Sequence, residues 1–438
     1  MPALPARRRP FVVPCGHTGK LPAVTSTNTT RGPRYALGVL TFINLFNYVD
    51  RWVVAAVLEP LKHELGLSDT QLGIIGAGFI VVYAVTSPIF GRLGDRKARP
   101  PLIAIGVGIW SLATGLAGFA RGFWTLFVSR STVGVGEAAY GTIAPALLAD
   151  QFPLERRGRV MAFFFAAIPV GSAAGYVLGG LADKYFGWRS AFWIAGFPGV
   201  LLALLVLLVN DPPRGLHDVH TPRASGTRMR DAYADLFRNR PYILAVLGYA
   251  AYTFALGGLG FWMPAFLERA RGMARSEATV TFGGIVIVTG FVGTFIGGWL
   301  GDRLLSRTRQ SYLWVSGIAT LLAAPLTLLG LMAHQRSVYL PAIVAAEVLI
   351  FMSTGPVNSA ILNAVSPVER ATAVGLSVFV MHFLGDIPSP PLIGALSDSS
   401  SLARGILVVP VAIVIAGSIW SIAAWLGGRA AAAQVATS

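Results

Sequence analysis

The chain has 438 residues, of which 54% are hydrophobic and only 13% charged, and its formal net charge is +15. Soluble domains usually carry about 25% charged residues, so this composition excludes an ordinary water-soluble protein. The positive charge does not indicate a nucleic-acid partner, because the basic residues lie in short loops between apolar runs and not on one basic face. The single cysteine, Cys15, excludes an internal disulfide and a cysteine-ligated metal, and we expect neither a metal nor a cofactor.

Twelve apolar stretches reach the length of about 20 residues that a helix needs to cross a bilayer. Eight of them contain no Asp, Glu, Lys or Arg: 70–91, 101–120, 160–182, 190–210, 241–267, 278–301, 310–335 and 405–428. Four more contain ionisable side chains: 35–58, 122–149, 337–368 and 371–397. The sequence therefore predicts an all-α polytopic membrane protein with twelve transmembrane helices.

A polar, basic segment at 211–240 separates these stretches into two sets of six. We expect one six-helix bundle at 34–210 and a second at 241–428, with 211–240 as a cytoplasmic linker. Residues 1–33 lack the apolar core of a signal peptide and are expected to form a disordered cytoplasmic tail. The last residues, 429–438, are expected to form a second cytoplasmic tail.

Arginine and lysine are unevenly distributed over the predicted loops. With both termini placed in the cytoplasm, 24 of the 35 basic residues fall on the cytoplasmic side and 9 on the other, while Arg51 and Arg130 lie within spans. Cytoplasmic loops carry the excess of basic residues in membrane proteins. We therefore expect an integral membrane protein with both termini in the cytoplasm, located in the inner (plasma) membrane if the source is bacterial.

A short sequence recurs at equivalent points of the two predicted bundles. Gly91-Arg-Leu-Gly-Asp-Arg ends the second span, and Gly298-Trp-Leu-Gly-Asp-Arg ends the eighth, 207 residues later. Together with the basic residues up to Arg99, the first copy resembles the loop signature of the major facilitator superfamily. That resemblance implies two pseudo-symmetric six-helix bundles around a central cavity, which rocking of the bundles exposes to one side of the membrane at a time.

The charged residues of both copies are candidates for gating: Asp95, Arg96, Asp302 and Arg303. We expect Asp95 and Arg96 to pair with charges at neighbouring helix ends, such as Asp150 or the loop 155–159. Such pairs would latch the cytoplasmic face in one state of the transport cycle.

Three further segments are similar to the Spinster branch of the superfamily: Asn47–Arg51 in the first span, Arg130–Tyr140 in the fourth and His382–Asp386 in the eleventh. Animal members of this branch move lysophospholipids and sphingosine phosphate. The resemblance implies a substrate of the lysophospholipid or sphingoid type, and it implies that spans 1, 4, 7 and 10 line the cavity.

Few ionisable residues interrupt the apolar spans, and a charge at the bilayer centre costs about 2.5–3.5 kcal/mol or more, so each is a functional candidate. They are Asp50, Arg51, Arg130, Glu137, Glu347, His382 and Asp386. At ~1.5 Å per residue, Asp50 and Glu137 fall at similar depths, and we interpret them as proton-coupling carboxylates. Arg130 would be their counter-charge and would anchor an anionic headgroup, since guanidinium binds phosphate through two hydrogen bonds. The structural alternative is that Arg130 and Glu137 neutralise each other.

Tyr48, Tyr140 and Glu347 complete the expected substrate-binding set, together with Arg130 and Glu137. The alternative for the two tyrosines is plain packing, and for Glu347 it is a neutral, hydrogen-bonded carboxyl group. Arg51 follows Asp50 directly and points ~100° away on the helix, so we expect it to pair with another helix and to act in gating.

His382 and Asp386 are four residues apart, a spacing that allows contact on one helix face. Asp386 precedes Pro388, Pro390 and Pro391, which predicts a break in the eleventh span. We interpret the pair and the break as a gate, with a structural pair that caps the break as the alternative.

These features favour a proton-coupled secondary transporter, acting as a monomer in the bilayer, that moves an amphipathic lipid by alternating access. One alternative is a transporter of the same fold for small organic anions or drugs. A second is a membrane-embedded enzyme that uses His382 and Asp386. The sequence has no metal-ligand cluster or nucleophile motif, so we expect no enzymatic activity. A non-transporting receptor is the third alternative.

Overall fold

The computed structural model describes residues 31–216, 229–365 and 370–437. Every regular element within these ranges is a helix, apart from one isolated β-bridge between Arg31 and Val209. The expected all-α fold is therefore confirmed. Most of the predicted N-terminal tail lies outside the described residues.

Seven helices precede the linker: α1 (Pro33–Ala56), α2 (Leu58–Leu65), α3 (Asp69–Arg96), α4 (Arg99–Ala117), α5 (Phe123–Gln151), α6 (Leu154–Phe186) and α7 (Trp188–Val206). The others are α8 (Met229–Arg238), α9 (Arg240–Arg271), α10 (Arg275–Leu304), α11 (Ser311–Met332), α12 (Arg336–Phe351), α13 (Thr354–Asn363), α14 (Arg370–Met381), the π-helix η1 (His382–Asp386), α15 (Ser389–Ser399), α16 (Leu402–Gly405) and α17 (Val408–Thr437). Because α17 continues to Thr437, most of the predicted C-terminal tail at 429–438 is helical.

Ten helical segments of the described residues are long and apolar enough to cross a membrane. Among them, α12 with α13, and α14 with η1 and α15, each count as one segment. The ten do not include α1 and α5, which have 24 and 29 residues and carry the central charged residues. At ~1.5 Å per residue both helices exceed the ~30 Å of a bilayer core. The full count of twelve stays a prediction.

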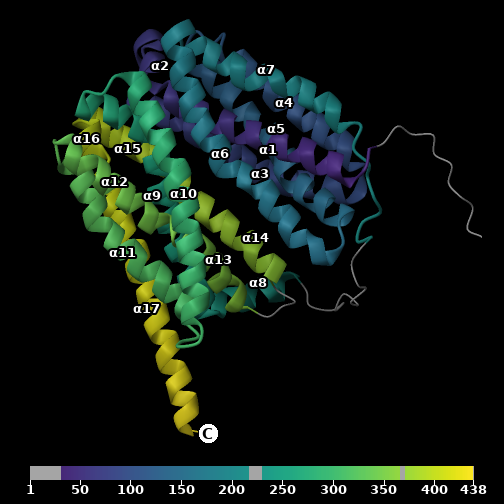
Figure 1. Cartoon of the computed structure of the whole chain (residues 1–438), viewed down its shortest axis with the longest axis vertical. Helices are drawn as coiled ribbons and strands as arrows, with labels where there is room; N and C mark the ends of the chain where they lie inside the picture. The colour runs from purple at the N-terminus through teal and green to yellow at the C-terminus, as the bar shows by residue number, and fades with distance from the viewer. Residues whose placement is uncertain (1–30, 217–228, 366–369, 438) are drawn as a thin grey trace, which may run out of the picture.

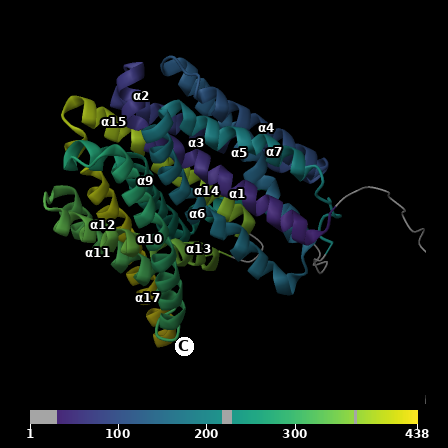
Figure 2. The same cartoon turned by 45° about the horizontal axis from the view of Figure 1, so that its top comes forward.

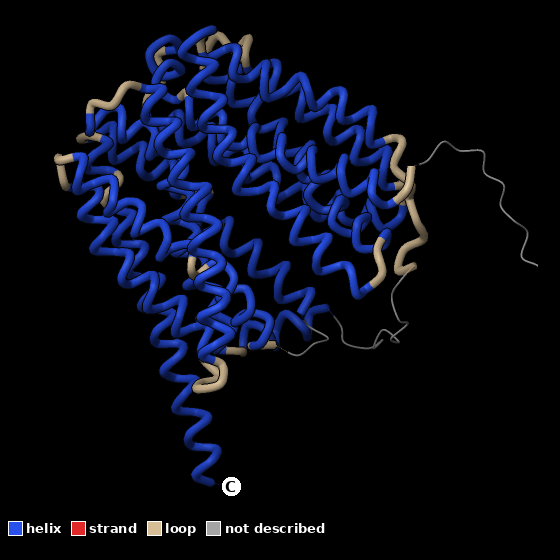
Figure 3. Tube along the Cα trace, viewed as in Figure 1, coloured by secondary structure: helices blue, strands red, loops and turns tan. Residues whose placement is uncertain are grey.

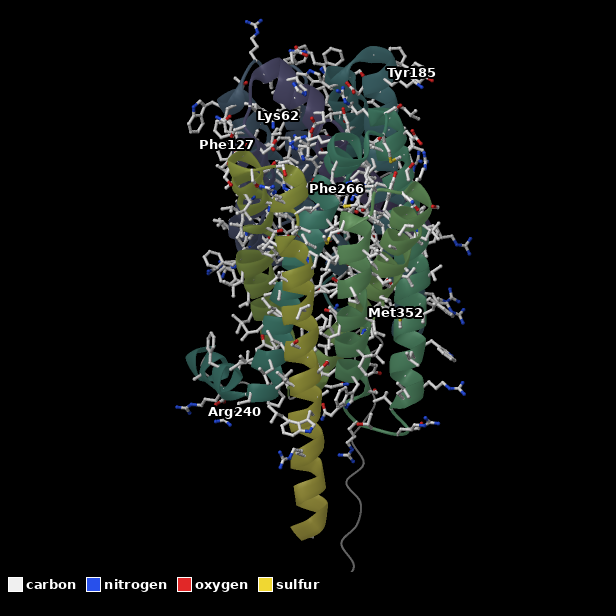
Figure 4. All side chains as sticks on the ribbon, turned by 90° about the vertical axis from the view of Figure 1, so that its left-hand side faces the viewer. Lys62, Phe127, Tyr185, Arg240, Phe266 and Met352 are labelled. Atoms are coloured by element: carbon white, nitrogen blue, oxygen red, sulfur yellow. The ribbon has the colours of Figure 1, made fainter. Side chains whose placement is uncertain are left out.

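The helices form two sets that meet at one end of the molecule and diverge toward the other (Figure 1). One set contains α1–α7, and the other contains α9–α17; the same separation is visible after rotation (Figure 2). We call the end with α2 and α16 the α2 face and the opposite end, where α8 lies, the linker face. Most of the connecting loops lie at these two faces (Figure 3). Lys62 lies at the α2 face and Arg240 toward the linker face (Figure 4).

Local sequence signals position the helices that carry the charged residues. Ser68 and Gln71 form a capping box that starts α3, and Gly66, with a φ of 62°, ends α2 in the left-handed conformation that glycine adopts at low cost. A Cβ atom at Gly134 would lie 2.5 Å from the backbone oxygen of Phe79. Glycine at this position therefore lets α5 approach the backbone of α3 closely.

Arg269 joins the two helix sets at the α2 face. From the end of α9, its guanidinium donates to Glu59 of α2 at 2.5 Å and to both carboxylate oxygens of Asp69 of α3 at 2.7 and 2.9 Å. Asp69 also accepts from Lys62 at 2.7 Å and from Ser397 of α15 at 2.5 Å. The buried carboxylate of Asp69 is therefore compensated by partners from both sets.

Asp398 adds a second connection at the same face. Its carboxylate accepts hydrogen bonds from the backbone N–H groups of Asp69 and Thr70, at 2.9 and 2.8 Å, and from the Thr70 hydroxyl at 2.6 Å. A carboxylate at a helix N-terminus satisfies free N–H groups and stabilises the helix dipole. The end of α15 thus caps the start of α3. Arg275 of α10 also reaches Asp183 of α6, at 2.9 Å.

On α2 itself, Glu64 accepts a hydrogen bond from the Trp188 indole N–H at 2.6 Å and another from Arg189. The hydrogen bond from Trp188, followed by that from Arg189, lowers the pKa of the Glu64 carboxyl group. These contacts hold α2 against the start of α7, so that Glu59 stays in place for Arg269.

Charged residues at the linker face correct one prediction. The partner of Asp150 is Arg99, at 2.5 Å, and not Arg96. Arg99 is buried and also binds Asp211, at 2.6 Å, whereas Asp95 and Arg96 are exposed. Arg99 is favoured because Pro100 and Pro101 start α4 there, next to the beginning of the linker. In the second copy of the repeat, Asp302 accepts from Tyr312 at 2.8 Å, and Arg303 lies 5.2 Å from the ring centre of Trp299.

We predict that Arg269→Gln opens the α2 face, because it leaves Asp69 and Glu59 with fewer partners. The closed form of this face should lose about 1–3 kcal/mol of free energy relative to the open form. Electron spin resonance can measure the distance between labels on Tyr185→Cys and Ser399→Cys in a Cys15→Ser background. The distribution should gain a longer component.

Arg336→Gln is the matched control, because Arg336 pairs at the same face with the exposed Glu277, within one helix set. It should leave the distance distribution unchanged. An unchanged distribution in the Arg269 variant would contradict the assigned role of Arg269.

Candidate functional site

Asp50 and Arg130 form a fully buried ion pair between α1 and α5. Arg130 donates through Nη1 to Asp50 Oδ1 at 2.6 Å and through Nη2 to the Asp50 backbone oxygen at 3.2 Å. Thr114 of α4 donates its hydroxyl to Asp50 Oδ2 at 2.5 Å. Both carboxylate oxygens of Asp50 therefore have a donor, as a charge in a low-dielectric interior requires.

Glu137 and Arg51 form a second ion pair between the same two helices. Arg51 Nε donates to Glu137 Oε2 at 2.7 Å. Glu137 is fully buried, whereas 22% of the Arg51 side chain is exposed. The other oxygen, Glu137 Oε1, is buried without a hydrogen-bond partner among the described residues. This pair is thus only partly compensated, unlike the Asp50–Arg130 pair.

Each of the two ion pairs connects a residue of α1 with a residue of α5. Arg51 pairs with a residue of another helix, as expected. The alternative in which Arg130 and Glu137 neutralise each other is wrong. Arg130 neutralises Asp50, and Arg51 neutralises Glu137. Arg130 and Glu137 are seven positions apart, which separates their Cα atoms by ~10 Å along the helix axis, so each reaches a partner on α1 instead.

Three aromatic rings surround the guanidinium group of Arg51. Its central carbon lies 5.0 Å from the ring centres of Tyr48 and Tyr83 and 5.2 Å from that of Phe79. At such distances a cation is attracted to the ring faces, with about 0.5–2 kcal/mol for each contact. The rings therefore hold Arg51 in position while leaving its hydrogen-bonding edge available.

A cavity of about 110 Å³ lies between the two helix sets, next to the ion pairs. Its polar lining consists of Arg51, Arg130, His382 and Asp386, together with Tyr83. The rest is mainly apolar or aromatic: Trp52, Val54, Ile75, Gly76, Phe79, Ile80, Gly257, Phe261 and Pro390. Such a mixture suits a ligand with one charged end and one apolar end.

His382 and Asp386 lie on the opposite wall of this cavity. His382 Nδ1 is 2.9 and 3.0 Å from the two carboxylate oxygens of Asp386, which confirms the predicted contact. Both residues belong to η1, and the helix restarts as α15 at Ser389. The break in the eleventh span is thus a π-helical turn, a feature that often marks functional sites.

Of the five expected substrate-binding residues, Arg130 lines this cavity, Glu137 and Tyr48 contact Arg51 beside it, and Tyr140 and Glu347 lie away from it. Tyr140 is buried, donates its hydroxyl to the Leu40 backbone oxygen at 2.5 Å and packs with Trp110 at a ring distance of 5.5 Å. Glu347 lies in α12 and lines a different, smaller cavity of about 10 Å³. Tyr48 reaches the site through the ring contact with Arg51.

Phe79 and Tyr83 are among the aromatic residues that the sequence offers as a lining for an amphipathic cavity, with plain packing as the alternative, whereas the sequence did not single out Thr114. Phe79 and Tyr83 are four residues apart on α3 and so share one face, but aromatic residues at helical spacing are common in membrane helices. Thr114 lies in an otherwise uninterrupted apolar span, where a hydroxyl group carries no signal of its own. In the described part of the chain, no three His, Cys, Asp or Glu side chains are grouped as metal ligands.

Comparison with known proteins identifies the class to which this fold and site belong. Residues 40–390 match the model of the Major Facilitator Superfamily, and the chain belongs to that superfamily of transporters. It is thus a membrane transporter and not an enzyme.

Two curated relatives identify the family within this superfamily. Protein spinster homolog 3 of Danio rerio is 35% identical over 396 residues, which cover 86% of this chain and 79% of the relative. Protein spinster homolog 1 of Homo sapiens is 36% identical over 382 residues, covering 83% and 72%. The chain therefore belongs to the Spinster family within the superfamily.

A solved structure supports the fold. The bacterial homologue of the human lysosomal transporter Spinster, in an inward-facing and unoccupied conformation, matches with a TM-score of 0.82 at 24% identity, over 91% of this chain and 98% of the homologue. The chain accordingly has the major facilitator fold.

We predict that Asp50→Asn lowers the free energy of unfolding by about 3–5 kcal/mol, because it leaves Arg130 buried without a counter-charge. The double variant Asp50→Asn/Arg130→Gln should lose much less than the sum of the two single variants. Denaturation in detergent micelles measures these differences.

The control is a double-mutant cycle that combines Glu137→Gln with Arg130→Gln, because these two residues do not pair in the structure. Its coupling energy should be clearly smaller than that of Asp50 with Arg130. A larger coupling energy between Arg130 and Glu137 would contradict the pairing of Arg130 with Asp50.

Proposed function

We propose that this transporter moves an amphipathic lipid of the lysophospholipid or sphingoid type and couples the movement to protons by alternating access. The Arg51–Glu137 pair is the main support. A partly exposed guanidinium group lines the cavity, and its partner is a fully buried carboxylate with one unpaired oxygen. Protonation of Glu137 and binding of an anionic headgroup at Arg51 can therefore favour each other at this pair.

The proposed coupling begins at Glu137. A proton on Glu137 removes the negative charge that holds Arg51, so Arg51 becomes available to an anion in the cavity. A phosphate group suits this position, because guanidinium stays charged and offers two parallel N–H donors. The rings of Tyr48, Phe79 and Tyr83 keep Arg51 at the cavity wall during the exchange.

Asp50 is the second proposed proton-coupling carboxylate. Its partner Arg130 also lines the central cavity, so an anion near Arg130 would compete with Asp50 for the guanidinium group. The hydroxyl of Thr114 supplies the remaining hydrogen bond to Asp50. Two arginines that line one cavity, each paired with a buried carboxylate, would allow proton binding and headgroup binding to depend on each other.

The apolar lining of the cavity supports a lipid-like substrate over a small organic anion. Trp52, Ile75 and Phe261 offer a surface for a hydrocarbon chain beside the arginines. Membership of the Spinster family supports the same substrate class, because the resemblance to that family implies a lysophospholipid or sphingoid substrate. A small organic anion would need the charged part of the site alone.

We place the α2 face on the outside, because most of the basic residues in the loops lie on the other side. Arg269, Asp69 and Asp398 then close the outer side, and the cavity opens toward the cytoplasm. The π-helical turn at His382–Asp386 contributes to the cavity wall and is followed by α15, the helix that carries Asp398. Bending at this turn would release Asp398 from the start of α3 and open the outer side.

We predict that Glu137→Gln abolishes accumulation driven by a pH gradient, because glutamine cannot exchange a proton. The measurement is uptake of labelled lysophosphatidylethanolamine into proteoliposomes with and without the gradient. The wild type should accumulate the lipid only with the gradient, and the variant should at most equilibrate it.

Glu277→Gln is the matched control, because Glu277 is an exposed carboxylate outside the cavity, and it should keep gradient-driven uptake. Normal gradient-driven uptake by the Glu137 variant would contradict the coupling role. Uptake of a small organic anion in place of the lysolipid would contradict the substrate class and leave the coupling role intact.

A further inference from the structure

Glu347 is a buried carboxyl group that the proposed coupling does not use. It lies on α12, is 4% exposed and lines a cavity of about 10 Å³. Its neighbours in this cavity are apolar except for Thr327: Leu259, Met263, Leu331, Ile343, Ala346 and Ile350. The space is at the lower limit for a single water molecule, so the carboxyl group depends on protein atoms for hydrogen bonds.

The helices around Glu347 provide no counter-charge. Neither α11 nor α13 has a charged residue, and α9 and α10 have theirs only near their ends: Arg240, Glu268, Arg269, Arg271, Arg275, Glu277, Asp302 and Arg303. The titratable groups within electrostatic reach are the phenols of Tyr176 and Tyr252. Each donates to a backbone oxygen, of Gly260 at 2.6 Å and of Ile350 at 3.0 Å.

The neighbouring hydroxyl of Thr289 on α10 has a nearer acceptor than Glu347. Thr289 Oγ1 lies 2.7 Å from the Ile285 backbone oxygen and 3.5 Å from Glu347 Oε2. A hydroxyl group has one hydrogen, and the shorter contact takes it. The free lone pairs of Thr289 can then accept a hydrogen bond, which only a protonated Glu347 can donate.

We infer that Glu347 is a proton-binding site of the second helix set, neutral in this conformation and bonded to Thr289 of α10. Ionisation would place an unpaired charge in an apolar cavity, which costs several kcal/mol unless water enters. Release of the proton therefore requires separation of α12 from α10.

The seam between α10 and α12 is built for close contact. A Cβ atom at Gly293 would lie 2.5 Å from the Val348 backbone oxygen, directly after Glu347. α10 also packs across the interface on α6, where Phe282 and Tyr176 have ring centres 5.0 Å apart. A change in the α10–α12 seam is thus transmitted to the contact between the two helix sets.

This site goes beyond the proposed function, because it lies outside the central cavity and does not need coupling at Asp50 or Glu137. Its protonation makes the seam sensitive to pH: the protonated form stabilises the closed seam of this conformation, and the ionised form favours an open seam.

Infrared difference spectroscopy of the purified full-length protein tests the protonation directly. At neutral pH, the wild type minus Glu347→Gln spectrum should contain the carbonyl stretch of a protonated carboxylic acid. The control difference with Glu277→Gln, an exposed ion-paired carboxylate, should contain a carboxylate band in its place. Absence of the protonated band in the Glu347 difference would overturn the inference.

Thr289→Val tests the contact between Glu347 and Thr289 without replacing Glu347. It therefore remains informative if Glu347→Gln does not fold. Loss of the acceptor should shift the protonated carbonyl band to higher frequency, and an unshifted band would contradict the assigned contact.

Spin labels on Phe295→Cys and Ala345→Cys, in a Cys15→Ser background, test the seam. The distance between them should lengthen at alkaline pH in the presence of Glu347 and stay constant in Glu347→Gln; equal behaviour of both would refute the pH-sensitive seam.

Discussion

The pairing of four charged side chains in the middle of the molecule determines how the first helix set is built. Asp50 and Arg51 on α1 meet Arg130 and Glu137 on α5, and Asp50 and Glu137 are fully shielded from solvent. In such surroundings an unpaired charge costs several kcal/mol. The two helices therefore have to lie at the distance and rotation at which both pairs form at once.

The rest of the packing around α5 makes that arrangement possible. Gly134 allows α5 to approach the backbone of α3, and the close contact between Gly106 and Gly136 brings α4 near enough for Thr114 to reach Asp50. The rings of Phe79 and Tyr83 on α3 then pack against the guanidinium group of Arg51. Charge pairing, small residues and aromatic contacts thus act on the same few helix turns, and a change in any of them alters the ion pairs.

A separate group of polar contacts determines which side of the molecule is closed. The bonds of Arg269, Asp69 and Asp398 lie at one end, at a distance from the central pairs, and join the two helix sets. The Arg269–Asp69 pair joins the two helix sets, whereas the Asp50–Arg130 and Arg51–Glu137 pairs lie within the first set. This difference suits alternating access, because the contacts at the face can open while the charges at the centre change partners.

Much of this arrangement is readable from the sequence, for physical reasons. The apolar runs predicted the membrane class and the helices, and the rarity of charges within those runs selected Asp50, Arg51, Arg130, Glu137 and Glu347. The partners of these charges were not predictable, because pairing depends on the rotation of one helix against another. This is why the sequence suggested Arg130 for Glu137 where the structure has Arg51.

The contacts at the helix ends were even less predictable. Glu59, Asp69, Arg269 and Asp398 sit beside loops, where charged residues are ordinary and carry no signal of a special role. Arg99 was missed as the partner of Asp150 because Asp95 and Arg96, nearer the repeated glycines, form the more familiar part of the signature. The three-dimensional arrangement of the helix ends supplies what the pattern lacks.

The central claim is that binding of an anionic headgroup at Arg51 and proton binding at Glu137 depend on each other. Titration calorimetry of lysophosphatidylethanolamine binding, repeated in buffers with different ionisation enthalpies, counts the protons taken up or released on binding. The account predicts a heat that depends on the buffer for the wild type, with net proton uptake, and a much smaller dependence for Glu137→Gln. Binding by the wild type with no buffer dependence would contradict it.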